Sequence, residues 1–257
     1  MLIHLPPSEG KTPPADGGDA LDLSALTLPE LAAPRREVLD ALAAASSRED
    51  AQKVLKVGAN VMGEVAANTR LDTAPTAPAH RLYTGVLYDA LDADTLDEAA
   101  RARAEDQVLI FSGLFGVTGF SDPIPAHRLS MGVTLAPEGR GPGRLSTFWK
   151  QALAEPLDAV IGDQLVVDCR SSAYAVHRAA AEQTLTVNSV TERDGERKVV
   201  THFAKHARGR LTGMLLRAER PAETIDDVAE IAASVWEVEV RPAAGRTPHQ
   251  LDLISRE

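Results

Sequence analysis

A short loop near the start of the chain carries side chains suited to holding an anion. The sequence Ser-Glu-Gly-Lys-Thr occupies residues 8–12, directly after an apolar run at residues 1–5. Ser8 and Thr12 supply hydroxyl donors, Gly10 lets the backbone approach closely, and Lys11 adds a positive charge on a flexible stem. We therefore predict that Ser8, Lys11 and Thr12 bind a phosphate-like group.

The same loop is a poor match to the phosphate-binding loop of nucleotide hydrolases. That motif requires glycine six positions before the lysine, where this chain has Leu5, and a helix that opens at the Lys-Thr pair. Pro13 and Pro14 follow at once and disfavour a helix. A standard P-loop is therefore not expected.

Further polar residues are expected at strand ends and loops, several of them beside glycines. Together with Ser8 and Lys11 they are Tyr83, Ser112, Arg128, Ser171, Tyr174, Lys205 and Arg208. Such a set favours an enzyme acting on a small phosphate-bearing or nucleotide-like molecule. Lys11 or Tyr174 would be the general acid or base, and Arg128 and Arg208 would fix the anion. The sequence contains no recognisable nucleophile–base pair, and no cofactor is expected. The sequence alone does not decide whether the protein is an enzyme.

A basic segment late in the chain supports a different function, DNA binding. Residues 193–220 hold eight Lys or Arg against three Asp or Glu, although the whole protein carries a net charge of −10. A confined positive strip on an acidic body is typical of a polyanion site. Aromatic residues make up only 4% of the chain, so bent or damaged duplex is favoured over single strands. The candidate contacts are Lys205, His206, Arg208, Arg210 and Arg217.

This basic segment is predicted to be a helix over residues 203–217, with Phe203, Ala207, Leu211 and Met214 on its apolar side. A solvated helix face is the alternative explanation of its charges. Two glycines within the helix, at 209 and 213, cost roughly 1 kcal/mol each relative to alanine. Another backbone or a ligand is therefore expected to approach there.

The remaining pattern predicts an α+β fold with a central sheet and flanking helices. Helices are expected at 28–45 and 49–68, with Ser46 and Ser47 as the break between them and the N-cap of the second helix. The two helices form a helical hairpin. A further helix is expected at 96–105, a helical turn or two at 148–154, and a helix followed by a strand at 224–241. Strands are expected at 1–5, 107–111, 159–161, 165–167 and 184–190, and a hairpin turn at 193–195 leads to a strand at 198–201.

Length and composition limit the remaining possibilities. At 257 residues the chain fits one domain over 1–257, and this domain is expected to be a monomer. No apolar stretch approaches the length of a membrane span, so a cytoplasmic location is expected. The single Cys169 excludes an internal disulfide and an all-cysteine zinc site, and is expected to be a small buried residue. His202 and His206 lack the glutamate of a metalloprotease helix, so no metal site is predicted.

Seven sequence blocks, in order, resemble the YaaA family of bacterial peroxide-stress proteins. They are residues 8–12, 82–85, 112–117, 128–132, 148–149, 171–174 and 203–209. The resemblance covers residues 1 to about 217. It implies a compact α+β unit, a role in limiting damage from peroxide and free iron, and DNA binding in a positively charged cleft.

The resemblance also implies a helix-hairpin-helix element for DNA contact. The hairpin at 28–68 is its expected place, where Lys56-Val57-Gly58 supplies part of a glycine-rich turn. The chain departs from the family pattern at residues 119–120, 126–127 and 168–170. These departures concern the detailed shape of the pocket, and they argue against Cys169 as a redox centre shared by the family.

Overall fold

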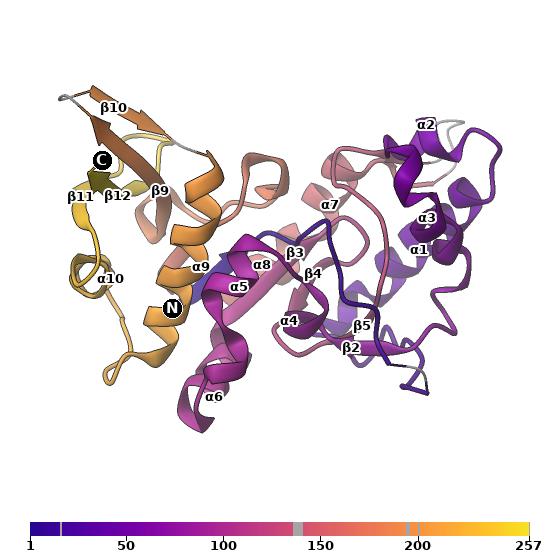
Figure 1. Ribbon diagram of the computed structural model, residues 1–257, viewed down its shortest axis with the longest axis horizontal. Helices are drawn as coiled ribbons and strands as arrows, with labels where there is room; N and C mark the ends of the chain where they lie inside the picture. The colour runs from indigo at the N-terminus through magenta and orange to yellow at the C-terminus, as the bar shows by residue number, and fades with distance from the viewer. Residues whose placement is uncertain (16, 136–140, 194–195, 200, 257) are drawn as a thin grey trace.

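A mostly parallel sheet runs through the computed structural model, which describes residues 1–15, 17–135, 141–193, 196–199 and 201–256 (Figure 1). Its strands are β1 (Leu2–Leu5), β3 (Val108–Ser112), β4 (Gly116–Gly119), β8 (Val166–Asp168), β9 (Thr184–Arg193), β10 (Glu196–Val199), β11 (Glu237–Arg241) and β12 (His249–Arg256). The order is β11-β12-β9-β8-β1-β3-β4, with β10 added on β9. The pairs from β12 through β3 are parallel, and the pairs with β4, β10 and β11 are antiparallel.

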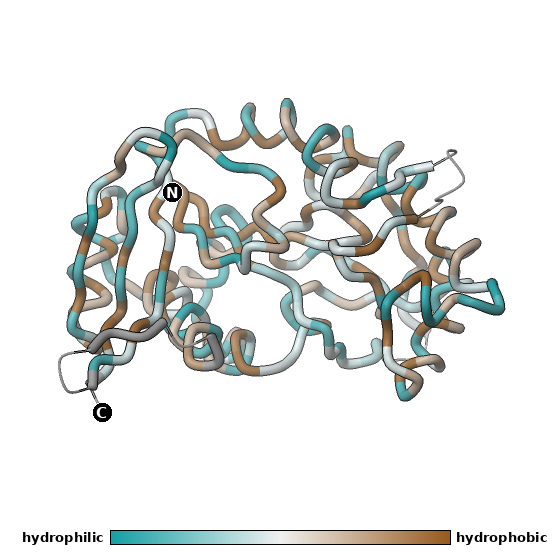
Figure 2. Tube along the Cα trace, turned by 90° about the horizontal axis from the view of Figure 1, so that it is seen from above, coloured by the Kyte–Doolittle hydropathy of each residue, from teal (hydrophilic) through white to brown (hydrophobic). Residues whose placement is uncertain are grey.

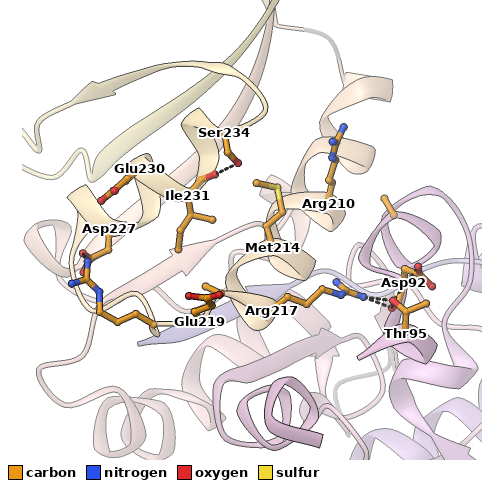
Figure 3. Close-up of a pocket in the computed structure, with 13 residues that line it drawn as sticks. Asp92, Thr95, Arg210, Met214, Arg217, Glu219, Asp227, Glu230, Ile231 and Ser234 are labelled. Carbon is orange, nitrogen blue, oxygen red and sulfur yellow. Dashed lines mark hydrogen bonds and ion pairs between the residues drawn. The ribbon is translucent and has the colours of Figure 1, made fainter. Parts of the chain in front are cut away.

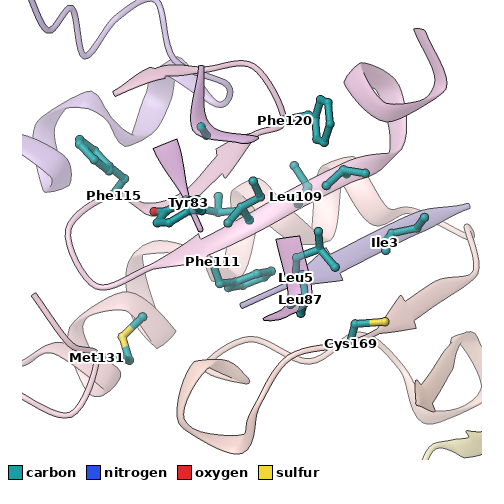
Figure 4. Packing of buried hydrophobic residues seen from close by; sticks show 14 of the residues in the cluster. Ile3, Leu5, Tyr83, Leu87, Leu109, Phe111, Phe115, Phe120, Met131 and Cys169 are labelled. Carbon is teal, nitrogen blue, oxygen red and sulfur yellow. The ribbon is translucent and has the colours of Figure 1, made fainter. Parts of the chain in front are cut away.

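The central strands are buried because both of their faces are covered. All residues of β1 and β3 are buried, and Ile3 and Leu5 lie in register with Val108 and Ile110. Such continuous apolar runs are typical of parallel strands covered on both faces. Hydrophobic residues concentrate along these strands near the N-terminus (Figure 2), and they pack with aromatic side chains such as Phe111 (Figure 4).

Helices flank the sheet and also form a group at one end of it. They are α1 (Ala32–Ser46), α2 (Ala51–Leu55), α3 (Met62–Ala67), α4 (Ala79–Leu82), α5 (Val86–Leu91), α6 (Glu98–Gln107), α7 (Leu145–Ala152), α8 (Ala154–Ile161), α9 (Thr201–Arg217) and α10 (Ile225–Ala233). Two small sheets pair β2 (Thr76–Pro78) with β5 (Pro123–Pro125) and β6 (Thr134–Leu135) with β7 (Gly143–Arg144). Helices α1 to α3 lie at the opposite end of the molecule from β10 to β12 (Figure 1). The predicted α+β class is confirmed.

The second predicted helix, at 49–68, is wrong as one continuous element. Lys56 ends α2 in the left-handed region at φ 55°, and Gly58 is extended before α3. Ser47 does not cap the N-terminus of α2. Its backbone N–H and hydroxyl bond the last carbonyls of α1 instead, including that of Ala43 at 3.2 and 3.0 Å. The hairpin therefore consists of one long helix and two short ones.

The predicted strand at 159–161 is also wrong, because these residues end α8. Leu157 and Ile161 are buried one helical turn apart, whereas Val160 is exposed, which is the pattern of an amphipathic helix. The predicted hairpin turn at 193–195 falls partly outside the described residues. The strands on either side of it do pair, with Arg193 opposite Glu196.

The glycines of α9 mark a close backbone approach, as predicted, and the neighbour is helix α5. A Cβ atom on Gly209 would lie 2.0 Å from the carbonyl oxygen of Leu87, and one on Gly213 would lie 2.8 Å from that of Leu91. The apolar side differs from the prediction, because Phe203 is 56% exposed. The buried side consists of Ala204, Ala207, Leu211, Leu215 and Leu216.

Candidate functional site

The loop after β1 is held by the segment that follows α4. The Ser8 hydroxyl accepts a hydrogen bond from the backbone N–H of Thr84 at 3.0 Å and donates to the carbonyl of Gly10 at 2.6 Å. The N–H of Thr12 donates to the carbonyl of Leu82 at 2.9 Å. Two sequence blocks about seventy residues apart thus form one structure, and the chain from Thr12 to Ala15 is not helical. The expectation against a P-loop is confirmed.

Lys11 is directed back into its own loop. Its Nζ donates to the carbonyls of Ser8 at 3.1 Å and Glu9 at 3.4 Å, and lies 5.4 Å from the ring centroid of Tyr83. Burial, followed by the nearby positive charge of Arg128, lowers the pKa of Lys11 from 10.5 to about 8. A lysine with this pKa can hold an anion and can also exchange a proton near neutral pH.

Arg128 and Lys11 both line a cavity of about 290 Å³. Its Nη1 donates to the carbonyl of Glu9 at 3.1 Å, and its Nη2 pairs with the Glu9 carboxylate at 3.1 Å. Glu64 of α3 lies 3.5 Å from Nη1. The buried amide of Asn68 bonds both backbone groups of Arg128. Asn68 is not among the predicted site residues, because no local sequence pattern distinguishes a buried positioning amide from a surface one.

Tyr174 and the turn after α2 complete this cavity, which we call the Lys11 cavity. Burial raises the pKa of Tyr174, partly opposed by the backbone of Met131 and the hydroxyl of Ser130. Lys56 donates from Nζ to the carbonyl of Gly132 at 2.9 Å. The predicted glycine turn at 56–58 therefore borders the same cavity as Lys11, Arg128 and Tyr174.

Six of the predicted ligand residues do not line the Lys11 cavity, and two of them, Lys205 and Arg208, belong to α9. Tyr83 is buried under Lys11, and burial raises its pKa. The Ser112 hydroxyl is fully buried and accepts hydrogen bonds from the N–H groups of Leu114 and Phe115, so it shapes a turn. Thr12 and Ser171 are exposed outside the cavity.

Arg208 lies in a separate hollow of about 420 Å³, which we call the arginine pocket. It is lined by four arginines, Arg170, Arg178, Arg208 and Arg246, and by one carboxylate, that of Asp168. Arg170 binds this carboxylate through two hydrogen bonds, of 2.8 and 2.7 Å. Arg170 holds the pKa of Asp168 below its usual range, although burial opposes this effect.

A third hollow lies next to both of these sites. It shares Gly132 with the Lys11 cavity and shares Ser172, Ala175 and Arg178 with the arginine pocket. The three hollows together, called the basic groove below, contain eight Lys or Arg and three carboxylates. These are Lys11, Lys56, Arg128, Lys150, Arg170, Arg178, Arg208 and Arg246 against Glu9, Asp158 and Asp168.

The basic side chains of α9 point in different directions. Lys205 precedes Arg208 by one turn on the same side of the helix. On the other side, Arg217 donates to the carbonyl of Asp92 and to the hydroxyl of Thr95, both at 2.6 Å (Figure 3). Arg217 lines a fourth hollow, of about 710 Å³. Its lining also includes Arg210, Arg220 and four carboxylates, those of Asp92, Glu219, Asp227 and Glu230. His206 is exposed.

Cys169 is fully buried, as predicted, and burial raises the pKa of its thiol to about 12. No group of three or more His, Cys, Asp or Glu side chains in the described ranges is placed to hold a metal ion. The side chain of His202 lies outside the described part of the chain. Among the described helices, none combines the length and the apolar content needed to cross a bilayer.

Comparison with known proteins agrees with the resemblance. The family model described as peroxide stress protein YaaA matches residues 1–240. A UPF0246 protein of Streptomyces coelicolor is 43% identical over 100% of this chain and 99% of its own length. A UPF0246 protein of Corynebacterium efficiens is 43% identical over 90% of this chain and 91% of its own length. The chain therefore belongs to the YaaA family of peroxide stress proteins.

Proposed function

We propose that this protein binds duplex DNA in the basic groove and so limits iron- and peroxide-dependent damage to the bound DNA. The supporting observation is the composition of the groove, with eight cationic side chains against three carboxylates in a protein of net charge −10. An acidic surface elsewhere repels the same ligand, so binding is confined to the groove.

The helical hairpin contributes one wall of this groove. Its turn at 56–58 borders the Lys11 cavity. Lys205, one helical turn before Arg208 on α9, adds a positive charge next to the arginine pocket. We propose that these lysines and arginines contact phosphates, and phosphate contacts carry no direct sequence information, so recognition of DNA shape is favoured. Because bacterial DNA lies in the cytoplasm, this function places the protein there, and one groove per chain suffices for a monomer.

Fluorescence anisotropy of a labelled duplex at several salt concentrations tests this function. The logarithm of the affinity should fall linearly with the logarithm of salt concentration. Lys150→Gln and Lys205→Ala should each weaken binding to every sequence and reduce the slope by about one per lost phosphate contact. The matched control is Arg81→Gln, since Arg81 is exposed and lies outside the groove. No binding at low salt, or unchanged binding in both variants, contradicts the proposal.

A second candidate is an enzyme acting on a small phosphate-bearing molecule in the Lys11 cavity. The lowered pKa of Lys11, opposite Arg128 and beside Tyr174, favours it. Lys11 or Tyr174 would move the proton and Arg128 would fix the anion. A nucleotide and metabolite screen tests this function. Lys11→Ala should abolish binding of any hit while the melting temperature without ligand stays unchanged, and a large loss of stability would make Lys11 structural.

A further inference from the structure

The arginine pocket brings together four arginines from four separate segments. Arg170 follows β8, Arg178 precedes β9, Arg208 belongs to α9, and Arg246 lies in the turn between β11 and β12. That turn is tight, because Ala244 and Thr247 exchange two backbone hydrogen bonds of 3.0 Å each. The convergence of these segments is a property of the tertiary fold and not of the basic helix alone.

Two of these guanidinium groups are free to bind a ligand. The guanidinium group of Arg170 is paired with the carboxylate of Asp168. Arg208 donates from Nε and Nη2 to the carbonyl of Val187 at 2.9 and 2.8 Å. Arg178 and Arg246 are exposed, and neither makes a hydrogen bond or ion pair with any described residue. Arg208 lines the same pocket, and its Nη1 group makes no hydrogen bond with a described residue.

The charge of the pocket fits a dianion better than a monoanion. Four guanidinium groups face one carboxylate, which Arg170 already neutralises, so three positive charges remain. A phosphodiester within a DNA strand carries one negative charge. A phosphate monoester has a second pKa near about 6, so it carries close to two charges at neutral pH, and its oxygens accept bidentate hydrogen bonds from arginine.

We propose that the arginine pocket binds a phosphate monoester dianion, either of a free nucleotide or of the 5′-phosphorylated end of a DNA strand. The volume of about 420 Å³ lies within the range of ordinary small-ligand sites. The hydroxyls of Thr186 and Thr247 add neutral donors at its wall. The DNA source rests on the function proposed above, whereas the nucleotide source does not.

The experiment compares phosphorylated and unphosphorylated probes with the full chain. Calorimetry with adenosine 5′-monophosphate and with adenosine measures the nucleotide arm. Anisotropy with one duplex carrying either 5′-phosphate or 5′-hydroxyl ends measures the DNA arm. In at least one arm the phosphorylated probe should bind about tenfold more tightly. Arg178→Gln and Arg246→Gln should remove this preference without changing the melting temperature, whereas Arg81→Gln should retain it.

The outcomes separate this proposal from the DNA-binding function. Equal binding of phosphorylated and unphosphorylated probes in both arms overturns the monoester site, even if duplex DNA binds with a steep salt dependence. A preference that persists in both Arg178→Gln and Arg246→Gln also overturns it. Tight nucleotide binding that is lost in those variants, without any DNA binding, supports the monoester site and contradicts the function proposed above.

Discussion

The side chain of Asn68 satisfies both backbone hydrogen-bonding groups of Arg128. Its Oδ1 accepts from the Arg128 N–H at 2.9 Å, and its Nδ2 donates to the Arg128 carbonyl at 3.0 Å. Asn68 is 1% exposed and follows the last helix of the hairpin. One buried amide therefore connects the hairpin to the arginine of the Lys11 cavity, although sixty positions separate the two residues.

Asn68→Ala should lower the free energy of unfolding by about 2–4 kcal/mol, because it leaves two backbone polar groups of Arg128 without their partner. Chemical denaturation measures this loss. The control is Asn60→Ala, since Asn60 is exposed in the same hairpin and should change stability by less than about 0.5 kcal/mol. Equal effects of the two substitutions would show that the Asn68 bonds do not hold Arg128.

Lys11 should give stability a characteristic pH dependence. Its pKa is about 8 in the folded state against 10.5 in the reference state, so between these values the unfolded state binds more protons. Stability should therefore rise with pH over this range, by up to roughly 3 kcal/mol from this group. Binding of an anion in the Lys11 cavity should weaken over the same range, as the ammonium loses its charge.

The difference between the wild-type protein and Lys11→Met isolates this contribution from other titrating groups. Free energies of unfolding measured at pH 7, 8, 9 and 10 should diverge in favour of the wild type as pH rises. Parallel curves would mean that the pKa of Lys11 is not lowered in the folded protein.

Gly209→Ala should destabilise the protein strongly, because its new methyl group would lie 2.0 Å from the backbone oxygen of Leu87. Separating α5 from α9 is expected to cost about 3 kcal/mol or more. Gly63 of α3 is the matched control, since nothing lies within 4 Å of its added Cβ, and Gly63→Ala should stabilise by about 0.5–1 kcal/mol. Thermal melts of both variants measure the contrast, and a mild effect at Gly209 would contradict the close helix contact.

Arg35 is a fully buried arginine that joins the start of α1 to the β3–β4 hairpin. It donates to the carbonyls of Thr27, Leu28, Phe115 and Val117 at 2.6–3.2 Å. Arg35→Met should cost about 3–5 kcal/mol, because the carbonyls lose their donors together. The neighbouring Arg36 is exposed and pairs with Asp72, so Arg36→Met should cost less than about 1 kcal/mol. Similar losses in denaturant titrations of the two variants would contradict this role.

The sequence determined the α+β class, the central strands β1, β3, β8 and β9, and the basic helix, because buried apolar runs and helical periodicity are local properties. It also indicated that another backbone or a ligand approaches Gly209 and Gly213, since glycine is unfavourable inside a helix. Local patterns failed at the second hairpin helix, where Lys56 adopts a left-handed conformation, and at residues 159–161, where a short apolar run is compatible with helix or strand.

The site depended on tertiary structure, because its members come from segments far apart in the chain. Ser8, Lys11, Arg128 and Tyr174 line one cavity, whereas Arg208 lines another and Tyr83 and Ser112 are buried supports. The arginine pocket could not be predicted, since Arg178 and Arg246 lie in loops without any motif. The residue types determined which chemistry was available to this protein. The packing of the strands and of α5 against α9 decided which of those residues face the same space.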